Sequence, residues 1–225
     1  MLAPPPMKRI GLLGGSFNPA HRGHRRISLA ALDALGLDEV WWLVSPGNPL
    51  KDEGGMAPFQ ARLASAAAMA RRAPIRVSDF EDRARTRYTV DTVAALRRRH
   101  PDKSFIWLMG EDILPQFHRW KQWRRLASLV PIAVLSRPGY DGAARAASAM
   151  GWLRRFVRPS SHARNWTGWS VPAITLLRLP PDPASATALR ALDPNWHSRP
   201  QSRTTGRQRT GEPSSVRRPL ARSSH

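Results

Sequence analysis

The sequence predicts an α/β fold in which a doubly wound parallel sheet carries helices on both of its faces. Three observations lead to this prediction. Short apolar runs of strand length alternate along the chain with longer segments of helical spacing. Glycine or polar residues follow most of the apolar runs. The 225 residues are 41% hydrophobic, which is enough to build a packed core.

Six apolar runs predict strands. The first run ends in Gly14 and Gly15, and the second is closed by the turn residues Ser45, Pro46 and Gly47. The length of each run suits a strand that is buried on both faces. The predicted strands cover residues 9–13, 40–44, 75–77, 105–109, 132–135 and 174–177.

Five further segments have the apolar spacing of a helix. The second of them is rich in alanine, and the third opens at Thr89, has Asp91 in its first turn and ends in three arginines before Pro101. The predicted helices cover residues 24–35, 58–72, 89–99, 113–118 and 185–192. Because strands and helices alternate at this spacing, a parallel sheet is favoured.

The composition excludes several classes of protein. The chain has no cysteine, which rules out disulfides, thiolate zinc sites and a cysteine nucleophile. No apolar run approaches the ~18 residues of a membrane-spanning helix. Prolines precede the first positive charge, which is the wrong order for a signal peptide. We therefore expect a cytoplasmic protein with no membrane partner.

Positive charge is the dominant compositional feature. Lys and Arg number 36 against 16 Asp and Glu, a formal net charge of +20. Residues 198–225 contribute +6 of this, because they hold seven arginines and one glutamate, and they contain little to bury. We predict an N-terminal extension over residues 1–7, one folded domain over residues 8–197 and a disordered basic tail over residues 198–225. So large a charge calls for an anionic partner.

Glycine and polar side chains cluster after the first predicted strand, in the segment GGSFNPAHRGH. In a parallel α/β sheet the ligand lies beyond the carboxyl ends of the strands. Gly14 and Gly15 are expected to let the backbone approach a ligand and adopt positive φ, and Ser16 adds a polar group near the turn.

Two histidines in the same segment indicate a phosphate site. His21 and His24 are three residues apart, so they share a face near a helix N-terminus, where backbone N–H groups and the helix dipole attract phosphate. Gly23 leaves the backbone between them accessible. A zinc pair is an alternative, but no third ligand follows at a telling spacing. Two ordinary surface histidines are the other alternative.

Taken together, the motifs resemble those of the nucleotidyltransferase superfamily with the HxGH signature and a Rossmann-like fold. Within it, the form GGSFxPxHxGH resembles the nicotinate-nucleotide adenylyltransferases. Further matching segments span most of the predicted domain: NPLK at 48–51, RYTVDT at 87–92, MGEDILPQFHRWKQW at 109–123, SRPG at 136–139 and SATALR at 185–190.

The resemblance implies transfer of AMP from ATP to nicotinate mononucleotide, with His21 and His24 as catalytic residues. The residues implied in ATP binding are Gly14, Gly15, Ser16, His21, Gly23, His24, Ser185, Thr187 and Arg190. Those implied in binding nicotinate mononucleotide are Lys51, Thr89, Gly110, Asp112 and Trp120, the last by stacking on the ring, while Trp123 is expected in the core. Mg²⁺ is expected to arrive with ATP, and no metal ligands of the protein's own are implied.

Two other interpretations stay open at this point. The first is a sister enzyme that acts on nicotinamide mononucleotide or phosphopantetheine, or a cytidylyltransferase. The second is a basic nucleic-acid-binding protein, suggested by the charge of +20, although weak nucleic-acid binding by the tail is compatible with an enzyme. Glu111 is a departure from the family pattern, because its charge is unfavourable beside an anionic substrate unless it points away. The sequence makes no prediction of oligomeric state.

Overall fold

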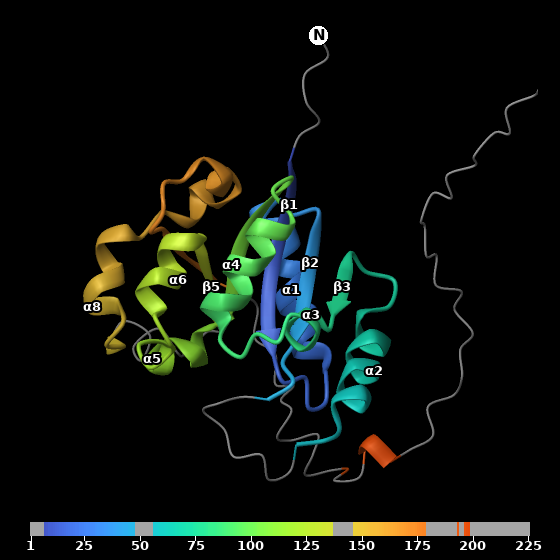
Figure 1. The fold of residues 1–225 in the computed structure, drawn as a ribbon. Coiled ribbons are helices and arrows are strands. Elements are labelled where there is room, and N and C mark those ends of the chain that lie inside the picture. The colour runs from blue at the N-terminus through green and yellow to red at the C-terminus, as the bar shows by residue number, and fades with distance from the viewer. Residues whose placement is uncertain (1–6, 48–55, 137–145, 179–192, 194–195, 199–225) are drawn as a thin grey trace, which may run out of the picture.

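The computed structural model describes residues 7–47, 56–136, 146–178, 193 and 196–198. A six-stranded, fully parallel sheet with strand order β3-β2-β1-β4-β5-β6 forms the centre of this part (Figure 1). The strands are β1 (Lys8–Gly15), β2 (Glu39–Val44), β3 (Ile75–Ser78), β4 (Lys103–Gly110), β5 (Ile132–Ser136) and β6 (Ile174–Arg178). The strand order reverses between β1 and β4, which makes this the doubly wound topology that the sequence predicts.

All six predicted strands are confirmed, and each is one to three residues longer than predicted. The central residues of β1, β4 and β5 are buried on both faces, as their continuous apolar runs require, whereas the edge strand β3 has no fully buried residue. One buried cluster includes Leu12, Trp41 and Trp107, and the other includes Leu13, Trp42 and Leu108. Neighbouring residues of each strand thus enter opposite layers of the core, which is the alternation of a pleated strand.

Helices cover both faces of the sheet. On the face of Leu13 and Trp42 lie α1 (Arg22–Leu35) and α2 (Phe59–Ala70), together with η3 (Ser160–Gly168). The other face is covered by α3 (Phe80–Arg83), α4 (Thr89–Arg99), α5 (Leu114–Phe117), α6 (Trp123–Leu129) and α8 (Met150–Leu153) (Figure 1). Three further short 3-10 helices are η1 (Glu111–Ile113), η2 (Arg154–Phe156) and η4 (Trp196–Ser198).

Several predicted helix bounds need correction. The first helix begins at Arg22 rather than at residue 24, because His21 caps it. The predicted helix 113–118 is a 3-10 turn followed by the short α5, and α3, α6, α8 and the 3-10 segments were not predicted. Thr89 does open α4, but the capping position is Tyr88, and no side chain caps it. The predicted helix 185–192 and the tail from residue 199 lie outside the described residues.

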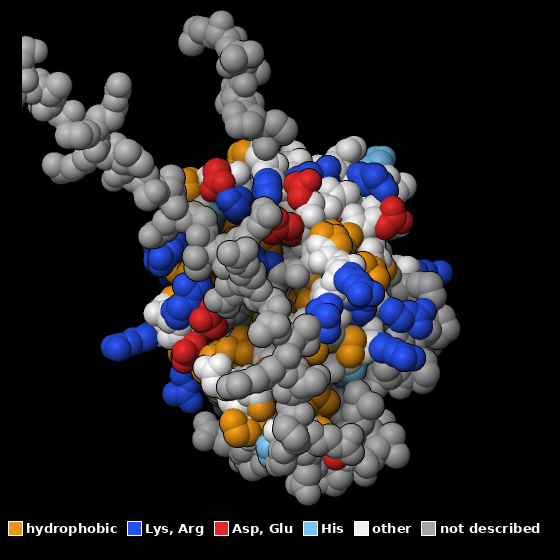
Figure 2. Space-filling model, turned by 90° about the vertical axis from the view of Figure 1, so that its right-hand side faces the viewer, with side chains coloured by type: hydrophobic (Ala, Val, Ile, Leu, Met, Phe, Trp, Pro, Cys, Tyr) orange, Lys and Arg blue, Asp and Glu red, His pale blue; other side chains and the backbone are white. Residues whose placement is uncertain are grey.

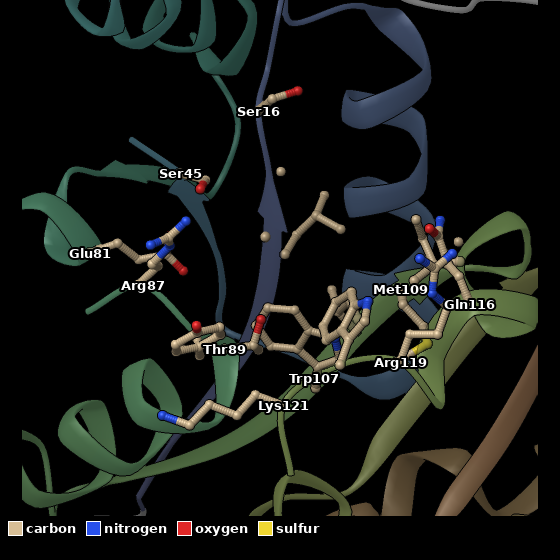
Figure 3. Close-up of a pocket in the computed structure, with 18 residues that line it drawn as sticks. Ser16, Ser45, Glu81, Arg87, Thr89, Trp107, Met109, Gln116, Arg119 and Lys121 are labelled. Atoms are coloured by element: carbon tan, nitrogen blue, oxygen red, sulfur yellow. The ribbon is translucent and has the colours of Figure 1, made fainter. Parts of the chain in front are cut away.

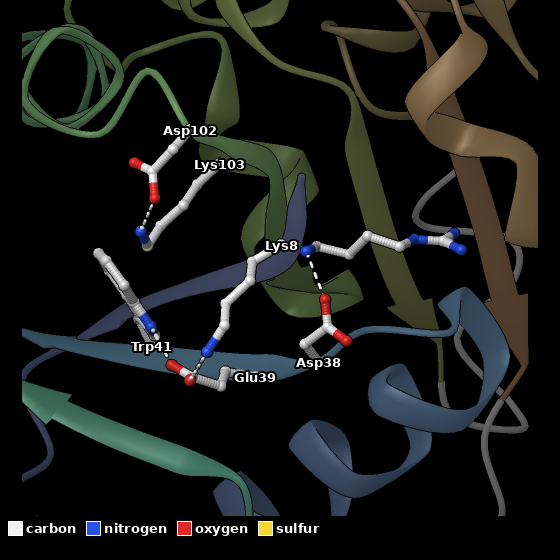
Figure 4. Close-up of polar contacts among 7 residues, drawn as sticks. Lys8, Asp38, Glu39, Trp41, Asp102 and Lys103 are labelled. Atoms are coloured by element: carbon white, nitrogen blue, oxygen red, sulfur yellow. Dashed lines mark hydrogen bonds and ion pairs between the residues drawn. The ribbon is translucent and has the colours of Figure 1, made fainter. Parts of the chain in front are cut away.

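The two ends of the sheet differ in chemistry. At the amino ends of the strands, Lys8 Nζ lies 3.4 Å from Glu39 Oε1, and the Asp38 carboxylate accepts a 2.7 Å hydrogen bond from the Arg9 backbone N–H (Figure 4). Such exposed pairs contribute little stability. The carboxyl ends carry the hollow described below. Figure 2, which views the molecule from the side of α2 and β3, displays Lys and Arg side chains over much of that face.

Candidate functional site

A cavity of about 230 Å³ opens at the carboxyl ends of β1 and β4, where the strand order reverses (Figure 3). This is the position at which doubly wound sheets bind their ligands. The strands, the α3 to α4 connection and the segment after β4 all contribute lining residues: Leu13, Gly14, Gly15, Ser16, Ser45, Glu81, Arg87, Tyr88, Thr89, Trp107, Leu108, Met109, Gly110, Ile113, Gln116, Arg119, Trp120 and Lys121.

The cavity combines aromatic walls with cationic groups. The rings of Trp107 and Trp120 meet edge to face, with centroids 6.1 Å apart, and Tyr88 lines the same space. Lys121 Nζ lies 4.3 Å from the centroid of the Tyr88 ring and 3.3 Å from Asp91 Oδ2. The exposed side chains of Arg87 and Arg119 line the cavity as well, so its chemistry suits a planar ligand that carries negative charge.

Glu81 is the acidic side chain among the described lining residues. It lies in α3, it is 8% exposed, and its Oε1 accepts a hydrogen bond from Thr92 Oγ1 at 3.3 Å. Burial raises the pKa of Glu81 to about 7, although hydrogen bonds with Thr92 and Ser45 act in the opposite direction. Glu81 is not among the site residues predicted from the sequence.

Gly14 and Gly15 lie within β1, so the expected bend with positive φ at these glycines is wrong. Gly14 is required for another reason: a Cβ there would lie 2.7 Å from Cη2 of Trp107. Glycine thus allows the Trp107 ring to pack directly against the β1 backbone at the cavity wall. At Gly110, a Cβ would collide with the Asp112 carboxylate.

The Gly14→Ala substitution therefore tests the cavity wall. We expect the added methyl group to displace Trp107 and to lower the free energy of unfolding by about 1–3 kcal/mol, the usual cost of overpacking a core. Urea unfolding followed by tryptophan fluorescence measures this. Gly151→Ala is the control, since a Cβ at Gly151 meets nothing within 4 Å. Equal stability of the two variants would contradict the role assigned to Gly14.

The sharp turn between β1 and α1 is made by Phe17, which has a left-handed φ of 48° and is 1% exposed. A bulky residue in this region is strained and persists only where packing requires it. The Phe17 ring stacks on the Trp42 ring, with centroids 4.9 Å apart. The centroid of the His24 imidazole lies 4.8 Å from the centroid of the Phe17 ring. The turn therefore packs the Phe17 ring against the His24 imidazole.

His21 and His24 cap the N-terminus of α1 reciprocally. The backbone N–H of Gly23 donates to Nδ1 of His21 at 3.1 Å, and the backbone N–H of His21 donates to Nδ1 of His24 at 3.2 Å. The two ring centroids are 3.9 Å apart. Because each Nδ1 accepts a hydrogen bond, the proton of each neutral ring resides on Nε2. Both imidazoles can thus donate from Nε2 while they hold the helix start in place.

Arg62 of α2 connects the chain segments that follow β1 and β2. It is 1% exposed, and its guanidinium donates to the carbonyl oxygens of Ser16 at 2.8 Å and Ser45 at 2.6 Å. It also donates to the carbonyls of Ala57 and Pro46, both at 2.9 Å. Burial lowers the pKa of Arg62 from its usual value. Two of the cavity-lining residues are therefore fixed by a buried cation.

The structure brings together many of the predicted site residues. Six line the cavity: Gly14, Gly15, Ser16, Thr89, Gly110 and Trp120. Three lie at the N-terminus of α1: His21, Gly23 and His24. Gly23 is buried and its backbone N–H donates to His21 Nδ1, so the expectation that it leaves the backbone accessible is wrong. Asp112 is exposed beside Gly110 and does not line the cavity. The remaining four lie outside the described residues: Lys51, Ser185, Thr187 and Arg190.

Two further expectations concern side-chain direction. Trp123 contacts Phe117 and Trp152, and Trp120 lines the cavity. Both tryptophans are partly buried and pack against the same core cluster, so the role of Trp120 toward a ligand stays a prediction. Glu111 is 5% exposed and is not among the residues that line the cavity.

Comparisons with known proteins agree with this architecture. The sequence profile of the cytidylyltransferase-like family matches residues 12–192. A probable nicotinate-nucleotide adenylyltransferase of Erythrobacter litoralis is 59% identical over 194 residues, which are 86% of this chain and 89% of that protein. One from Parvibaculum lavamentivorans is 51% identical over 185 residues, 82% of this chain and 92% of that protein. The chain belongs to the cytidylyltransferase-like family and, within it, to the nicotinate-nucleotide adenylyltransferases.

The fold of this nicotinate-nucleotide adenylyltransferase is also found in solved structures. Nicotinic acid mononucleotide adenylyltransferase of Plasmodium falciparum, complexed with APC, has a TM-score of 0.60 and 16% identity, and the match covers 82% of this chain and 83% of that one. The same enzyme complexed with NaAD gives a TM-score of 0.60 at 17% identity. These likenesses show the Rossmann-like fold, and the close relatives from Erythrobacter litoralis and Parvibaculum lavamentivorans show that the chain is a nucleotidyltransferase. No helix in its described part is both long and apolar enough to cross a bilayer.

Proposed function

We propose that the chain transfers the adenylyl group of ATP to nicotinate mononucleotide and forms deamido-NAD and pyrophosphate. The observation that carries the proposal is the cavity at the sheet's reversal point, with aromatic walls and three cationic side chains, next to an α1 N-terminus capped by two imidazoles. An aromatic ring that bears a carboxylate fits the cavity, and a chain of phosphates fits the N-terminus of α1. The 59% identity to a protein of this name supports the same substrate.

The chemistry needs little beyond positioning and charge neutralisation. The nucleophile is the phosphate of nicotinate mononucleotide, which is largely ionised at neutral pH because its second pKa is about 6. One of its oxygens forms a bond to the α-phosphorus of ATP while the bond from that phosphorus to the bridging oxygen of pyrophosphate breaks. No general base is required, so donors that stabilise the phosphoryl oxygens are the main catalytic tools.

His21 and His24 are the proposed catalytic donors. Their Nε2–H groups and the positive end of the α1 dipole would stabilise negative charge on the triphosphate as pyrophosphate departs. Ser16 and the backbone at Gly14, Gly15 and Gly23 complete the proposed cradle for ATP. Ser185, Thr187 and Arg190 keep their proposed role in holding ATP, and Lys51 keeps its role at a substrate phosphate.

The acceptor is assigned to the cavity itself. Trp120 would stack on the nicotinate ring and Thr89 would bind beside it, while Gly110 would contact the ribose. Asp112 keeps its proposed contact with the ribose from beside the cavity. The exposed cations Arg87, Arg119 and Lys121 favour a ligand whose ring carries a carboxylate, as nicotinate does, over one whose ring carries an uncharged carboxamide, as nicotinamide does.

Mg²⁺ is proposed to be carried by ATP. Across the described residues, His, Cys, Asp and Glu side chains do not gather in threes that could hold a metal. Mg²⁺ is commonly bound through substrate phosphate oxygens together with one or two carboxylates. When bound, the ion would neutralise charge on the phosphates. A cytoplasmic location is part of the proposal, since ATP and pyridine nucleotides are available there.

Release of pyrophosphate from ATP tests the function. Nicotinate mononucleotide, nicotinamide mononucleotide and phosphopantetheine are supplied in parallel as acceptors, with Mg²⁺ present. We expect pyrophosphate release to be fastest with nicotinate mononucleotide, with deamido-NAD as the second product. Faster release with either of the other acceptors would assign the chain to a sister activity instead.

A further inference from the structure

Glu81 is a buried acid in a cavity that otherwise suits an anion. We propose that Glu81 determines the affinity of this cavity for the anionic acceptor, which binds well when the carboxyl is neutral and poorly when it is ionised. This inference rests on the proposed function, because it concerns the binding of nicotinate mononucleotide.

The position of Glu81 gives it direct influence on a ligand. Its side chain lines the cavity together with Ser45, Arg87 and Thr89, and Figure 3 shows it on the same wall as Ser45 and Arg87. A negative charge at a buried wall is weakly screened, so it acts on the ligand more strongly than a surface charge would. An ionised Glu81 therefore opposes the carboxylate and phosphate of the acceptor.

Hydrogen bonds connect Glu81 to the turn that forms the adjoining wall. The Thr92 hydroxyl lies 3.3 Å from Glu81 Oε1, 2.9 Å from Thr86 Oγ1 and 3.3 Å from the carbonyl of Tyr88. Thr92 is fully buried, and its hydroxyl has one proton to share among these three acceptors. The backbone N–H of Thr86 also donates to the Glu81 carbonyl at 3.0 Å.

The charge state of Glu81 decides the direction of these hydrogen bonds. An ionised carboxylate can only accept hydrogen bonds, so the Thr92 hydroxyl donates to it. The Thr86 hydroxyl must then donate to Thr92 Oγ1. A neutral carboxyl can donate to Thr92, which leaves the Thr92 proton for Tyr88 or Thr86. Arg87, Tyr88 and Thr89 line the cavity and belong to the same turn as Thr86. A change in the direction of the Thr86 and Thr92 hydrogen bonds therefore alters the turn that presents these three residues to the ligand.

The other charges around Glu81 are few among the described residues. Arg87, Arg119 and Lys121 line the same cavity, and Lys121 is paired with Asp91 on α4. On α3 itself, Asp82 and Arg83 are exposed, and Arg83 pairs with Asp79. Burial remains the largest influence on the Glu81 carboxyl and raises its pKa to about 7. The change of charge therefore falls in the pH range in which the enzyme is assayed.

The test is the pH dependence of binding in the absence of ATP. The dissociation constant of nicotinate mononucleotide is measured by quenching of tryptophan fluorescence between pH 6 and 8.5, for the wild type and for Glu81→Gln. We expect affinity of the wild type to fall roughly tenfold over this range, while Glu81→Gln stays close to the high-affinity value. The phosphate of the ligand titrates equally in both proteins, so the comparison removes its contribution.

Asp82→Asn is the matched control, because it removes a carboxylate from the same short helix outside the cavity. It is expected to follow the wild-type profile. Nicotinamide mononucleotide serves as a second ligand: a pH-dependent loss for the nicotinate form alone places the repulsion at the ring carboxylate, and an equal loss for both places it at the phosphate. Either result supports the proposal.

The pH dependence of the free energy of unfolding reports the ionisation of the Glu81 carboxyl in the absence of ligand. The pKa of Glu81 is higher in the folded than in the unfolded chain, so ionisation costs stability as the pH rises towards about 7. Unfolding in urea should therefore show the wild type losing stability relative to Glu81→Gln between pH 5 and 7, with no further relative loss above that range.

Two results would overturn the proposal. One is an identical pH profile of binding for the wild type and Glu81→Gln, and the other is a lack of nicotinate mononucleotide binding by both proteins at every pH. A wild type that binds this ligand with the expected profile but releases no pyrophosphate would contradict the proposed function and leave the role of Glu81 intact.

Discussion

Replacement of His24 by alanine is expected to lower kcat by about 10²–10³-fold, the usual effect of removing one donor that stabilises a reacting oxyanion. The structure explains the size of the effect. His24 accepts a hydrogen bond from the backbone N–H of His21 at Nδ1, which fixes the ring and places the N–H of the neutral imidazole on Nε2. Packing against Phe17 limits the motion of the ring further. Steady-state pyrophosphate release at saturating ATP and nicotinate mononucleotide measures the loss.

Two variants separate catalysis from folding. The alanine variant also loses a helix cap, which costs roughly 1 kcal/mol of stability, so urea unfolding must accompany the kinetics. His24→Asn keeps an oxygen that can accept from His21 and should recover stability but not rate. His118→Ala removes an exposed histidine that does not line the cavity and should leave both unchanged. A His24→Ala enzyme with full turnover would refute the catalytic assignment.

Replacement of Arg62 by methionine is expected to lower the free energy of unfolding by about 3–5 kcal/mol, because each buried acceptor that loses its hydrogen-bond donor costs about 1–3 kcal/mol. Arg62 donates to four backbone carbonyls, and its loss leaves those of Ser16, Ser45, Ala57 and Pro46 without this partner. Ser16 and Ser45 line the cavity, so the KM for nicotinate mononucleotide should rise as well.

The measurement is urea unfolding followed by circular dichroism, together with KM at a temperature at which the variant is folded. Arg71→Met, at an exposed position just after the same helix, is the control and should fall within about 0.5 kcal/mol of the wild type. Arg62→Lys keeps the charge but offers a single donor group, so it should lie between the wild type and Arg62→Met. Wild-type stability of Arg62→Met would show that the carbonyl contacts are not needed.

The sheet could be predicted because its signal is local. A strand such as β4 is a continuous apolar run, and burial on both faces demands such a run wherever it falls in the sequence. The bounds of α4 were predicted to the residue, since Asp91 and the closing arginines mark its ends. By contrast, α6 has seven residues and begins after Gln122 in a left-handed conformation without a side-chain cap, so packing rather than local sequence specifies it.

The candidate site was likewise predicted only in part from the sequence. The segment GGSFNPAHRGH indicated a phosphate-binding turn from its residue types alone, and the structure gives its histidines an N-terminal capping arrangement. The mechanism of the turn was predicted wrongly, since Phe17 rather than a glycine adopts the positive φ. The missed residues Arg87, Arg119 and Lys121 did carry a signal, because each stands within or beside a motif that the sequence analysis had singled out.

By itself, the sequence determined the six strands and the longer helices α1, α2 and α4, and it predicted a phosphate-binding turn after β1, because periodicity, glycine and histidine spacing act over a few residues. Only the tertiary structure decided that Arg62 and Glu81 are buried at the site. Arg62 meets Ser16 across 46 positions of the chain, and Glu81 meets Thr92 from a neighbouring helix. A charged residue in an alanine-rich helix or a short acidic turn has the sequence pattern of a solvated surface group, and its burial depends on which distant segments fold over it.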